Sequence, residues 1–217
     1  MMNSIKVNYK ATEDLTTAST WIDNLQQYKV LACDFETAIR YTEEDLLAIK
    51  KELENSNITN RRKRLLQSVL NADALSHPSH TRLTHFSVAW SQQDAYVFII
   101  DSIEMQNLIL NFLVSTFVKQ VWHNFSFDGK HIYYYTNKFP IDFEDSQILA
   151  KTILNHTKNY KSKTGLKELA GYHYGNWGIS SEYFSTKDMR EEKVLKYAAT
   201  DACATFFIWN QMQELIK

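Results

Sequence analysis

The sequence is short of turn-forming residues. Glycine occurs 5 times and proline twice in 217 residues, where average usage would give about 26 of the two together. This shortage argues against turn-dense all-β folds, collagen-like repeats and glycine-rich phosphate-binding loops.

Long apolar runs and cysteines are also scarce. No stretch approaches the roughly 18 apolar residues that a membrane-spanning helix needs, and no charged–apolar–small signal peptide opens the chain. The two cysteines, Cys33 and Cys203, make a disulfide scaffold unexpected and favour a reduced compartment. We therefore expect a cytoplasmic protein with no membrane partner.

The sequence also has no large excess of positive or negative charge. The chain has 24 Lys and Arg against 25 Asp and Glu, a formal net charge of −1, so bulk electrostatics does not indicate a nucleic-acid binder. Hydrophobic residues make up 44% and aromatic residues 13%, which is enough for a core and excludes global disorder. The length predicts one domain over residues 1–217. Because the net charge does not indicate a nucleic-acid binder, evidence for such a function must come from local chemistry.

What is present is an alternation of strand and helix patterns, which predicts an α/β domain with a mixed sheet flanked by helices. An apolar run, "KVLACDFET", has the character of a buried central strand. Two β-rich segments after residue 80 predict an antiparallel hairpin. The expected strands are 5–10, 29–37, 82–90, 95–100 and 117–124, and the expected helices are 15–27, 103–114, one near 128, 148–154, 166–172 and 191–216.

Residues of about 42–80 differ from the rest and predict a helical insertion after the first catalytic strand. Their pattern indicates two amphipathic helices that break near Asn55–Asn60. Acidic residues open the first helix and the basic run Arg61–Arg64 opens the second, against the helix-dipole preference. The basic run fits either a solvated helix face or a phosphate contact.

Three short motifs occur in order: Asp34-Phe35-Glu36, then Asn124–Asp128, then Tyr197–Asp201. Each alone is weak, but all three in this order should arise by chance in roughly 1% of such chains or fewer. Side chains alternate along a strand, so Asp34 and Glu36 point to the same face near the strand's end. Two such carboxylates repel each other unless a cation lies between them.

The carboxylates fit phosphodiester hydrolysis. That reaction needs a hydroxide nucleophile and stabilisation of charge on the attacking and leaving oxygens, which two divalent cations roughly 4 Å apart supply. Hard cations such as Mg²⁺ prefer carboxylate oxygens. Four carboxylates from separate segments, Asp34, Glu36, Asp128 and Asp201, would meet that need.

The same motifs carry a resemblance to a known family. "DFET", "HNFSFD" and "YAATDA" resemble the three motifs of the DEDDy 3′–5′ exonucleases, which are DnaQ-like enzymes with a ribonuclease H-like fold. "EDSQILAKTIL" and "TGLKELAGY" resemble the helices between the last two motifs. The match is most similar to the proofreading exonuclease domain of family A (DNA polymerase I-like) DNA polymerases of phages, and it covers most of the chain outside the insertion.

The resemblance implies a two-metal site that uses Mg²⁺ or Mn²⁺. By resemblance Asp34 would bridge both metals, Glu36 and Asp201 would hold the metal that activates water, and Asp128 would serve the second metal. Tyr197, one helical turn before Asp201, would orient the attacking water. A phenol is mostly protonated at neutral pH, so the metal rather than Tyr197 would generate the hydroxide.

Contacts to the substrate are expected from a few further residues. By resemblance Thr37 and Asn124 would touch the terminal nucleotide. Phe127 could stack on a base, or it could simply pack in the core. Four lysines between the second and third motifs could guide phosphates or line a solvated loop: Lys158, Lys161, Lys163 and Lys167.

The resulting prediction is a metal-dependent exonuclease that releases nucleoside 5′-monophosphates from a single-stranded or frayed DNA 3′ end. Proofreading, replication or repair would be its setting, and a DNA polymerase its partner, in trans or as the rest of a longer chain. The pattern around "GLKELA" favours DNA. One alternative is an RNase D-like exoribonuclease, because 2′-OH recognition cannot be located from the sequence. The other is a non-catalytic nucleic-acid or polymerase-docking module.

Other polar residues are expected to be structural. His77, His80 and His85 lack further ligands at zinc spacing, so a loop is favoured over a metal site. His123 is expected to position structure rather than to catalyse. Asp145 is a carboxylate near the site that we do not assign to the metals.

Overall fold

The fold is that of a computed structural model, which describes residues 6–54, 58–70, 77–154, 164–174 and 189–216. Contacts divide the chain into two compact units, residues 1–36 with 84–217 and residues 37–83. In the described residues, no helix combines the length and the apolar character needed to cross a membrane.

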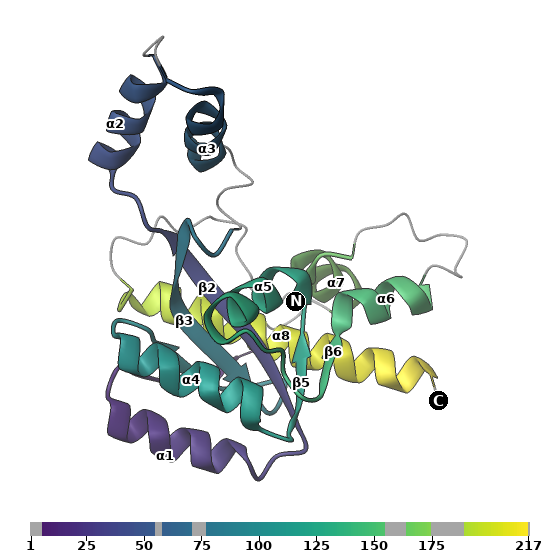
Figure 1. The fold of residues 1–217 in the computed structure, drawn as a ribbon. Coiled ribbons are helices and arrows are strands. Elements are labelled where there is room, and N and C mark those ends of the chain that lie inside the picture. The colour runs from purple at the N-terminus through teal and green to yellow at the C-terminus, as the bar shows by residue number, and fades with distance from the viewer. Residues whose placement is uncertain (1–5, 55–57, 71–76, 155–163, 175–188, 217) are drawn as a thin grey trace. The chain divides into compact units, whose positions relative to one another are not determined.

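A mixed six-stranded sheet forms the centre of the fold, in the order β1-β4-β3-β2-β5-β6 (Figure 1). The β3–β4 pair is the antiparallel hairpin predicted from the sequence, while β1–β4, β2–β5 and β5–β6 are parallel. The strands are β1 (Asn8–Thr12), β2 (Val30–Ile39), β3 (Thr81–Ala89), β4 (Asp94–Ile99), β5 (Lys119–Trp122) and β6 (Phe143–Asp145).

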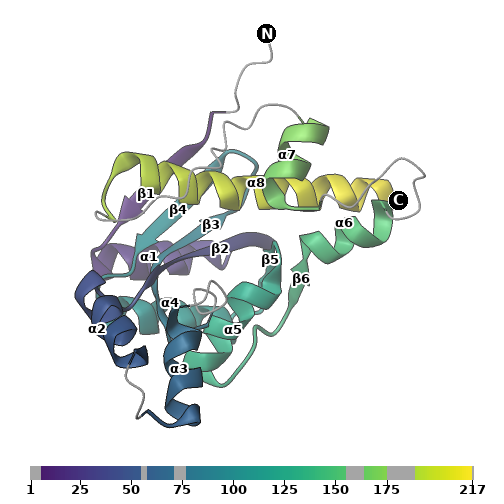
Figure 2. The ribbon, with the colours of Figure 1, turned by 90° about the horizontal axis from the view of Figure 1, so that it is seen from above.

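Helices cover both faces of this sheet in the larger unit. Figure 2 shows α6, α7 and α8 on one side of the strands and α1, α4 and α5 on the other. These helices are α1 (Leu15–Leu25), α4 (Ile103–Ser115), α5 (Phe125–Thr136), α6 (Ser146–Leu154), α7 (Leu166–Tyr174) and α8 (Glu192–Ile216). The three-layer α/β architecture is the one that the alternating strand and helix patterns predict.

Two elements are built to bring polar side chains into an apolar interior. β2 buries Leu31, Ala32, Cys33 and Phe35, as expected of a strand covered on both faces. α8 packs through small buried residues, among them Ala198, Ala199 and Ala202. Small side chains let a helix approach a sheet closely, so polar groups on this face of α8 come near β2.

The structure corrects some boundaries of the predicted elements. β2 continues to Ile39, so Asp34 and Glu36 lie inside the strand rather than at its end. Pairing continues past the strand, where the Arg40 backbone N–H donates to the His80 carbonyl at 2.9 Å. β6 was not predicted, because three residues at a sheet edge are too few for a visible alternation. Most of the segment between the predicted helices 148–154 and 166–172 lies outside the described residues.

The smaller unit contains two helices, α2 (Glu43–Leu53) and α3 (Asn60–Leu70). α2 begins with a capping box, in which the Asp45 N–H donates to Thr42 Oγ1 (3.1 Å) and the Thr42 N–H donates to Asp45 Oδ2 (2.8 Å). The predicted insertion at about 42–80 falls within this unit. Its boundaries and the assignment of 1–217 as a single exonuclease domain stay predictions.

Candidate active site

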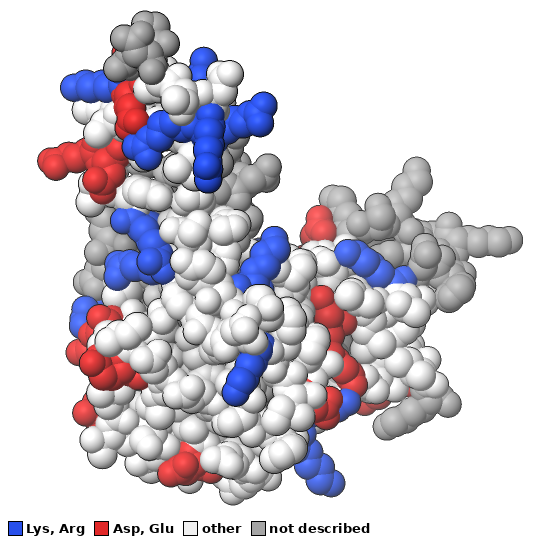
Figure 3. Space-filling model, viewed as in Figure 1, with Lys and Arg blue, Asp and Glu red and all other residues white. Residues whose placement is uncertain are grey.

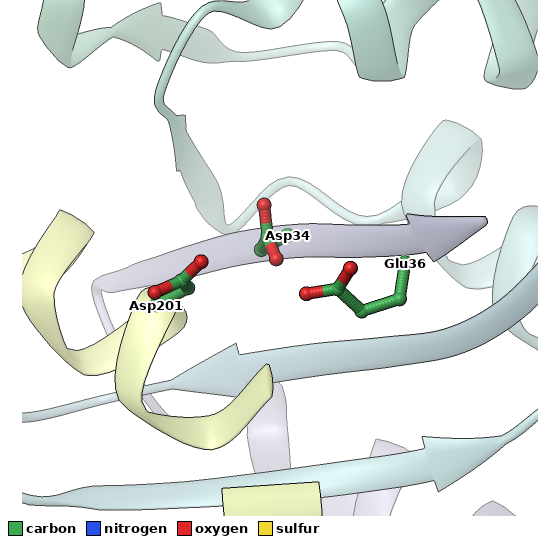
Figure 4. Close-up of side chains that lie close together, drawn as sticks. All are labelled: Asp34, Glu36 and Asp201. Carbon is green, nitrogen blue, oxygen red and sulfur yellow. The ribbon is translucent and has the colours of Figure 1, made fainter. Parts of the chain in front are cut away.

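Three of the four predicted metal-ligating carboxylates meet in one place. Asp34 and Glu36 come from β2 and Asp201 from α8, and ligand oxygens of the three lie within 4.8 Å of one another. Figure 4 shows the three carboxylates facing the same space beside β2. Alternation along the strand puts Asp34 and Glu36 on one face, and helix packing brings in Asp201.

The cluster has the donor set of a hard divalent cation. Asp201 is 6% exposed, and its Oδ1 is buried with no hydrogen-bond partner among the residues described. A buried oxygen without a partner is costly, and a cation would satisfy it. The three ligands are all carboxylates, without thiol or imidazole, which fits Mg²⁺ or Mn²⁺ better than zinc.

The pKa values of the three carboxyl groups also indicate a site for a cation. Burial and the neighbouring carboxylates raise the pKa of Asp34 well above its ordinary value. Burial, then Asp201, raise the pKa of Glu36 to about 8. Burial raises the pKa of Asp201 to about 6, opposed by the positive charge of Lys167 and by hydrogen bonding with Tyr197. Alone, the cluster would hold protons near neutral pH, and a divalent cation would displace them.

Asp128 lies beside the cluster in a different arrangement. It sits in the first turn of α5, is 2% exposed, and its Oδ1 accepts a hydrogen bond from the Phe35 backbone N–H at 3.2 Å. Burial raises its pKa to about 8, and its charge contributes to the raised pKa of Asp34. It is not one of the three carboxylates within 4.8 Å of one another, and its Oδ1 holds the backbone of β2.

Asp145 fixes the junction from which Asp128 projects. Its carboxylate accepts hydrogen bonds from the backbone N–H groups of Asn124 (3.1 Å) and Phe125 (2.8 Å) at the start of α5. It also accepts from the backbone N–H groups of Gln147 (2.8 Å) and Ile148 (3.2 Å) at the start of α6. One side chain thus caps two helices. An Asp three residues before the predicted helix 148–154 was the signal that could have shown the earlier start at Ser146.

Asn124 turns the chain between β5 and α5. Its backbone is left-handed, with φ 64° and ψ 54°, a conformation that Asn tolerates better than most residues. Its side-chain Oδ1 accepts a hydrogen bond from Ser126 Oγ at 2.9 Å. Farther along α5, a Cβ at Gly129 would lie 2.8 Å from the Phe125 ring, so only glycine fits beside Asp128.

His123 has the structural role that the sequence predicts. Its Nε2–H donates to the Thr164 carbonyl at 3.0 Å, so its Nδ1 accepts from the Ser146 hydroxyl at 2.8 Å. Burial lowers its pKa to about 4. It is therefore neutral at physiological pH and ties β5 to α6 and to the start of α7.

Tyr197 is held by a lysine whose role the sequence reasoning missed. Lys167 Nζ donates to the Tyr197 hydroxyl oxygen at 2.7 Å and lies 4.5 Å from the centroid of the Tyr197 ring. Burial, then the charges of Asp201 and Glu36, raise the pKa of Tyr197, so the phenol stays protonated. The sequence predicts for Lys167 either a guide for phosphates or a place in a solvated loop. It does not predict the contact with Tyr197, because the packing of α7 on α8 is not visible in local periodicity.

The residues predicted to touch the substrate differ in how exposed they are. Thr37 follows Glu36 in β2 and is partly exposed, Asn124 is exposed and Phe127 is partly exposed. The centroids of the Phe127 and His131 rings are 5.1 Å apart. Phe127 therefore packs against a neighbour and is also partly exposed. Their contacts to a nucleotide remain predictions. Lys158, Lys161 and Lys163 lie outside the described residues.

Histidines and cysteines outside the cluster have structural surroundings. Over the described residues, the carboxylate cluster is the one group that could hold a metal, and it contains no histidine. His85 is buried and donates from Nε2 to the Met189 carbonyl at 2.8 Å. Cys33 and Cys203 are buried free thiols whose pKa values burial raises, so they are not nucleophiles.

With this geometry established, comparison with known proteins assigns the class. Residues 72–217 match the 3′–5′ exonuclease family, which is more than half of the chain. The chain therefore belongs to the 3′–5′ exonuclease family and is a phosphodiester-cleaving enzyme. No curated protein sequence matches it significantly.

Solved structures share the fold at low sequence identity. Brucella melitensis NrnC with bound Mg²⁺ matches with a TM-score of 0.57 and 17% identity, over 99% of this chain and 82% of NrnC. The catalytic core of RRP6 from Trypanosoma brucei matches with a TM-score of 0.62 and 9% identity, over 96% of this chain and 47% of the RRP6 chain. Escherichia coli RNase D matches with a TM-score of 0.55 and 12% identity, over 96% of this chain and 45% of the RNase D chain. The predicted ribonuclease H-like fold is confirmed.

Proposed function

We propose that this enzyme removes nucleotides one at a time from a single-stranded or frayed 3′ end and releases nucleoside 5′-monophosphates. The observation that carries the proposal is the group of Asp34, Glu36 and Asp201, whose ligand oxygens lie within 4.8 Å of one another. The buried Oδ1 of Asp201 supports it, because no group of the described residues donates a hydrogen bond to this oxygen.

Two divalent cations, Mg²⁺ or Mn²⁺, would be held by these carboxylates. Asp34, Glu36 and Asp201 would hold one, and Asp34 with Asp128 would hold the other. When bound, such cations lower the pKa of water and stabilise charge on the attacking and leaving oxygens of a phosphodiester. An anionic pocket by itself repels a phosphate, so this carboxylate set has a use in phosphodiester cleavage only with cations present.

The remaining residues act on water and on the substrate. Lys167 donates to the Tyr197 oxygen, so the phenol's own proton is directed to an acceptor, either Asp201 or the attacking water. The raised pKa of Tyr197 keeps that proton in place, so Tyr197 orients the water and does not act as its base. Thr37, Asn124 and Phe127 are proposed to hold the terminal nucleotide.

DNA is the proposed substrate, in proofreading, replication or repair, with a DNA polymerase as partner. This choice rests on the similarity of the three motifs and of "GLKELA" to the proofreading domain of family A phage polymerases. The cytoplasm is the proposed location, supported by the two buried free cysteines. An RNase D-like exoribonuclease is the second candidate, because E. coli RNase D, with the same fold, is described as an exoribonuclease involved in structured RNA processing.

The test is digestion of 5′-labelled single-stranded DNA and of RNA of the same sequence, with Mg²⁺, with Mn²⁺ and with EDTA. We expect a metal-dependent ladder that shortens from the 3′ end, lost in the Asp34→Ala, Glu36→Ala protein and kept in Asp23→Ala, which removes an exposed carboxylate on α1. A stronger RNA ladder would transfer the proposal to the exoribonuclease. No metal-dependent degradation of either strand would overturn it.

A further inference from the structure

The exposed face of α3, in the smaller unit, has an unusual concentration of positive charge. α3 contains four basic residues, Arg61, Arg62, Lys63 and Arg64, and no acidic residue. The chain as a whole has a net charge of −1, so this helix departs from its surroundings. Figure 3 shows basic side chains gathered over α3.

The packing of α3 decides which of these charges are available. Leu66 and Val69 are buried, and Arg62, one turn before Leu66, lies on the same side of the helix. Arg62 is occupied by Glu52 of α2, with Nε–Oε1 at 2.7 Å and Nη2–Oε2 at 2.9 Å. This bidentate ion pair and the two apolar side chains fix the α2-facing side of α3.

The other three basic residues lie on the rest of the helix surface, away from Arg62 and the two buried side chains. At 3.6 residues per turn, Arg64 lies across the helix from Leu66 and Val69, with Arg61 and Lys63 on either side of it. All three are exposed, and within the described part of the chain none of them has a carboxylate partner. Arg61 and Lys63 lie in the first turn of α3, where positive charge is unfavourable, so this arrangement is not explained by the stability of the helix.

We propose that Arg61, Lys63 and Arg64 form a phosphate-binding surface that holds the nucleic acid on which the enzyme acts. The inference rests on the proposed function, which supplies a polyanion as the substrate. The catalytic cluster is acidic and repels a nucleic-acid backbone, so a separate basic surface gives the enzyme the attraction that its active site lacks. Three exposed basic side chains within four consecutive residues of one helix, with no acidic neighbour on that helix, have the character of a backbone contact that tolerates any sequence.

α2 and α3 precede the residues that match the exonuclease family, 72–217. In the chain, α3 lies between the first motif, Asp34–Glu36, and the second, Asn124–Asp128, and it contains no residue of the three motifs. The proposed surface is therefore additional to the motif residues. It predicts a preference for long strands, because only a nucleic acid that reaches both surfaces gains from the second contact.

The test compares two matched double variants of the full chain. Lys63→Gln with Arg64→Gln removes two adjacent charges from the proposed surface, and Lys50→Gln with Lys51→Gln removes two adjacent charges from α2. Gln has nearly the helix propensity of Lys and Arg, and circular dichroism checks that helix content is unchanged. Binding is measured by fluorescence anisotropy with a labelled 20-nucleotide single strand in EDTA, so that no cleavage occurs.

Each phosphate contact to a single strand contributes about 0.7 to the slope of log K against log salt, which is about 5-fold in affinity at 0.1 M salt. We expect the α3 variant to bind up to about 25-fold more weakly, with a slope smaller by about 1.4, and the α2 variant to change less than 2-fold. Cleavage of a dinucleotide with Mg²⁺ should be the same in both variants and in the unmodified protein.

Equal effects of the two variants, or no binding of the 20-mer by the unmodified protein, would overturn the proposed surface. Binding to anionic lipid vesicles without binding to the oligonucleotide would also overturn it, in favour of a membrane. Failure of the proposed function is a separate result, because it would appear as no metal-dependent cleavage of either the dinucleotide or the 20-mer.

Discussion

Replacing Glu36 by Gln should change stability in opposite directions without and with a divalent cation. The pKa of Glu36 is raised from 4.5 to about 8 by burial and by the neighbouring carboxylates. Between these pH values the folded state binds more protons than the unfolded state, so the free energy of unfolding falls as pH rises from about 4.5 to about 8. At about 1.4 kcal/mol per pKa unit, the cost of ionising Glu36 in the metal-free fold is at most about 5 kcal/mol.

Gln keeps the shape of the side chain and removes this charge. In EDTA at pH 8, Glu36→Gln should therefore raise the free energy of unfolding by up to a few kcal/mol. For a chain of this size, that corresponds to about 2–4 °C in Tm for each kcal/mol. At pH 5 the difference should nearly vanish, because Glu36 is then protonated in the folded state.

With a cation the order should reverse. A ligand at 100 times its Kd stabilises the fold by about 2.7 kcal/mol, or roughly 5–10 °C in Tm at this size. The unmodified protein should show this gain in Mg²⁺ or Mn²⁺, and Glu36→Gln should lose most of it, since one of three ligands has lost its charge.

The assay is differential scanning fluorimetry at pH 5 and pH 8, in EDTA and in excess MgCl₂. Asp23→Asn serves as the control, because Asp23 is an exposed carboxylate on α1 and should change neither value by more than about 1 °C. A lower Tm for Glu36→Gln in EDTA at pH 8 would refute the charge-repulsion argument. A full Mg²⁺ gain in Glu36→Gln would refute the metal site.

Three other substitutions test the supports of the site. Lys167→Met removes the charge that contacts Tyr197 and should lower kcat about 10-fold or more with little change in KM; an unchanged kcat would show that the contact does not position Tyr197. Asp145→Ala removes the cap of both α5 and α6 and should destabilise the fold by about 1–3 kcal/mol in urea titrations, whereas a loss under 0.5 kcal/mol would mean that water replaces it. Gly129→Ala places a methyl group against the Phe125 ring and should cost about 1–3 kcal/mol of stability; a Tm equal to that of the unmodified protein would show that the ring moves aside freely.

The local parts of the site could be predicted from the sequence. Alternation along one strand is enough to place Asp34 and Glu36 on the same face, and helical periodicity places Tyr197 one turn before Asp201. The order of three motifs and the alternation of strands and helices indicated the α/β class and the exonuclease family. These features depend on short-range geometry, which every strand or helix of that sequence shares.

Tertiary packing decided how close these groups come and what holds them. The approach of Asp201 to the carboxylates of β2, the hydrogen bond from Phe35 to Asp128, and the contact of Lys167 with Tyr197 join residues far apart in the chain. Local periodicity contains no information on which helix lies against which strand. The raised pKa values follow from that packing, because burial in the assembled fold is their largest cause. The sequence by itself therefore determined which residues could form the site and that Asp34 and Glu36 share one face. Only the tertiary structure decided that Asp201 joins them and that the cluster is buried enough to raise the three pKa values.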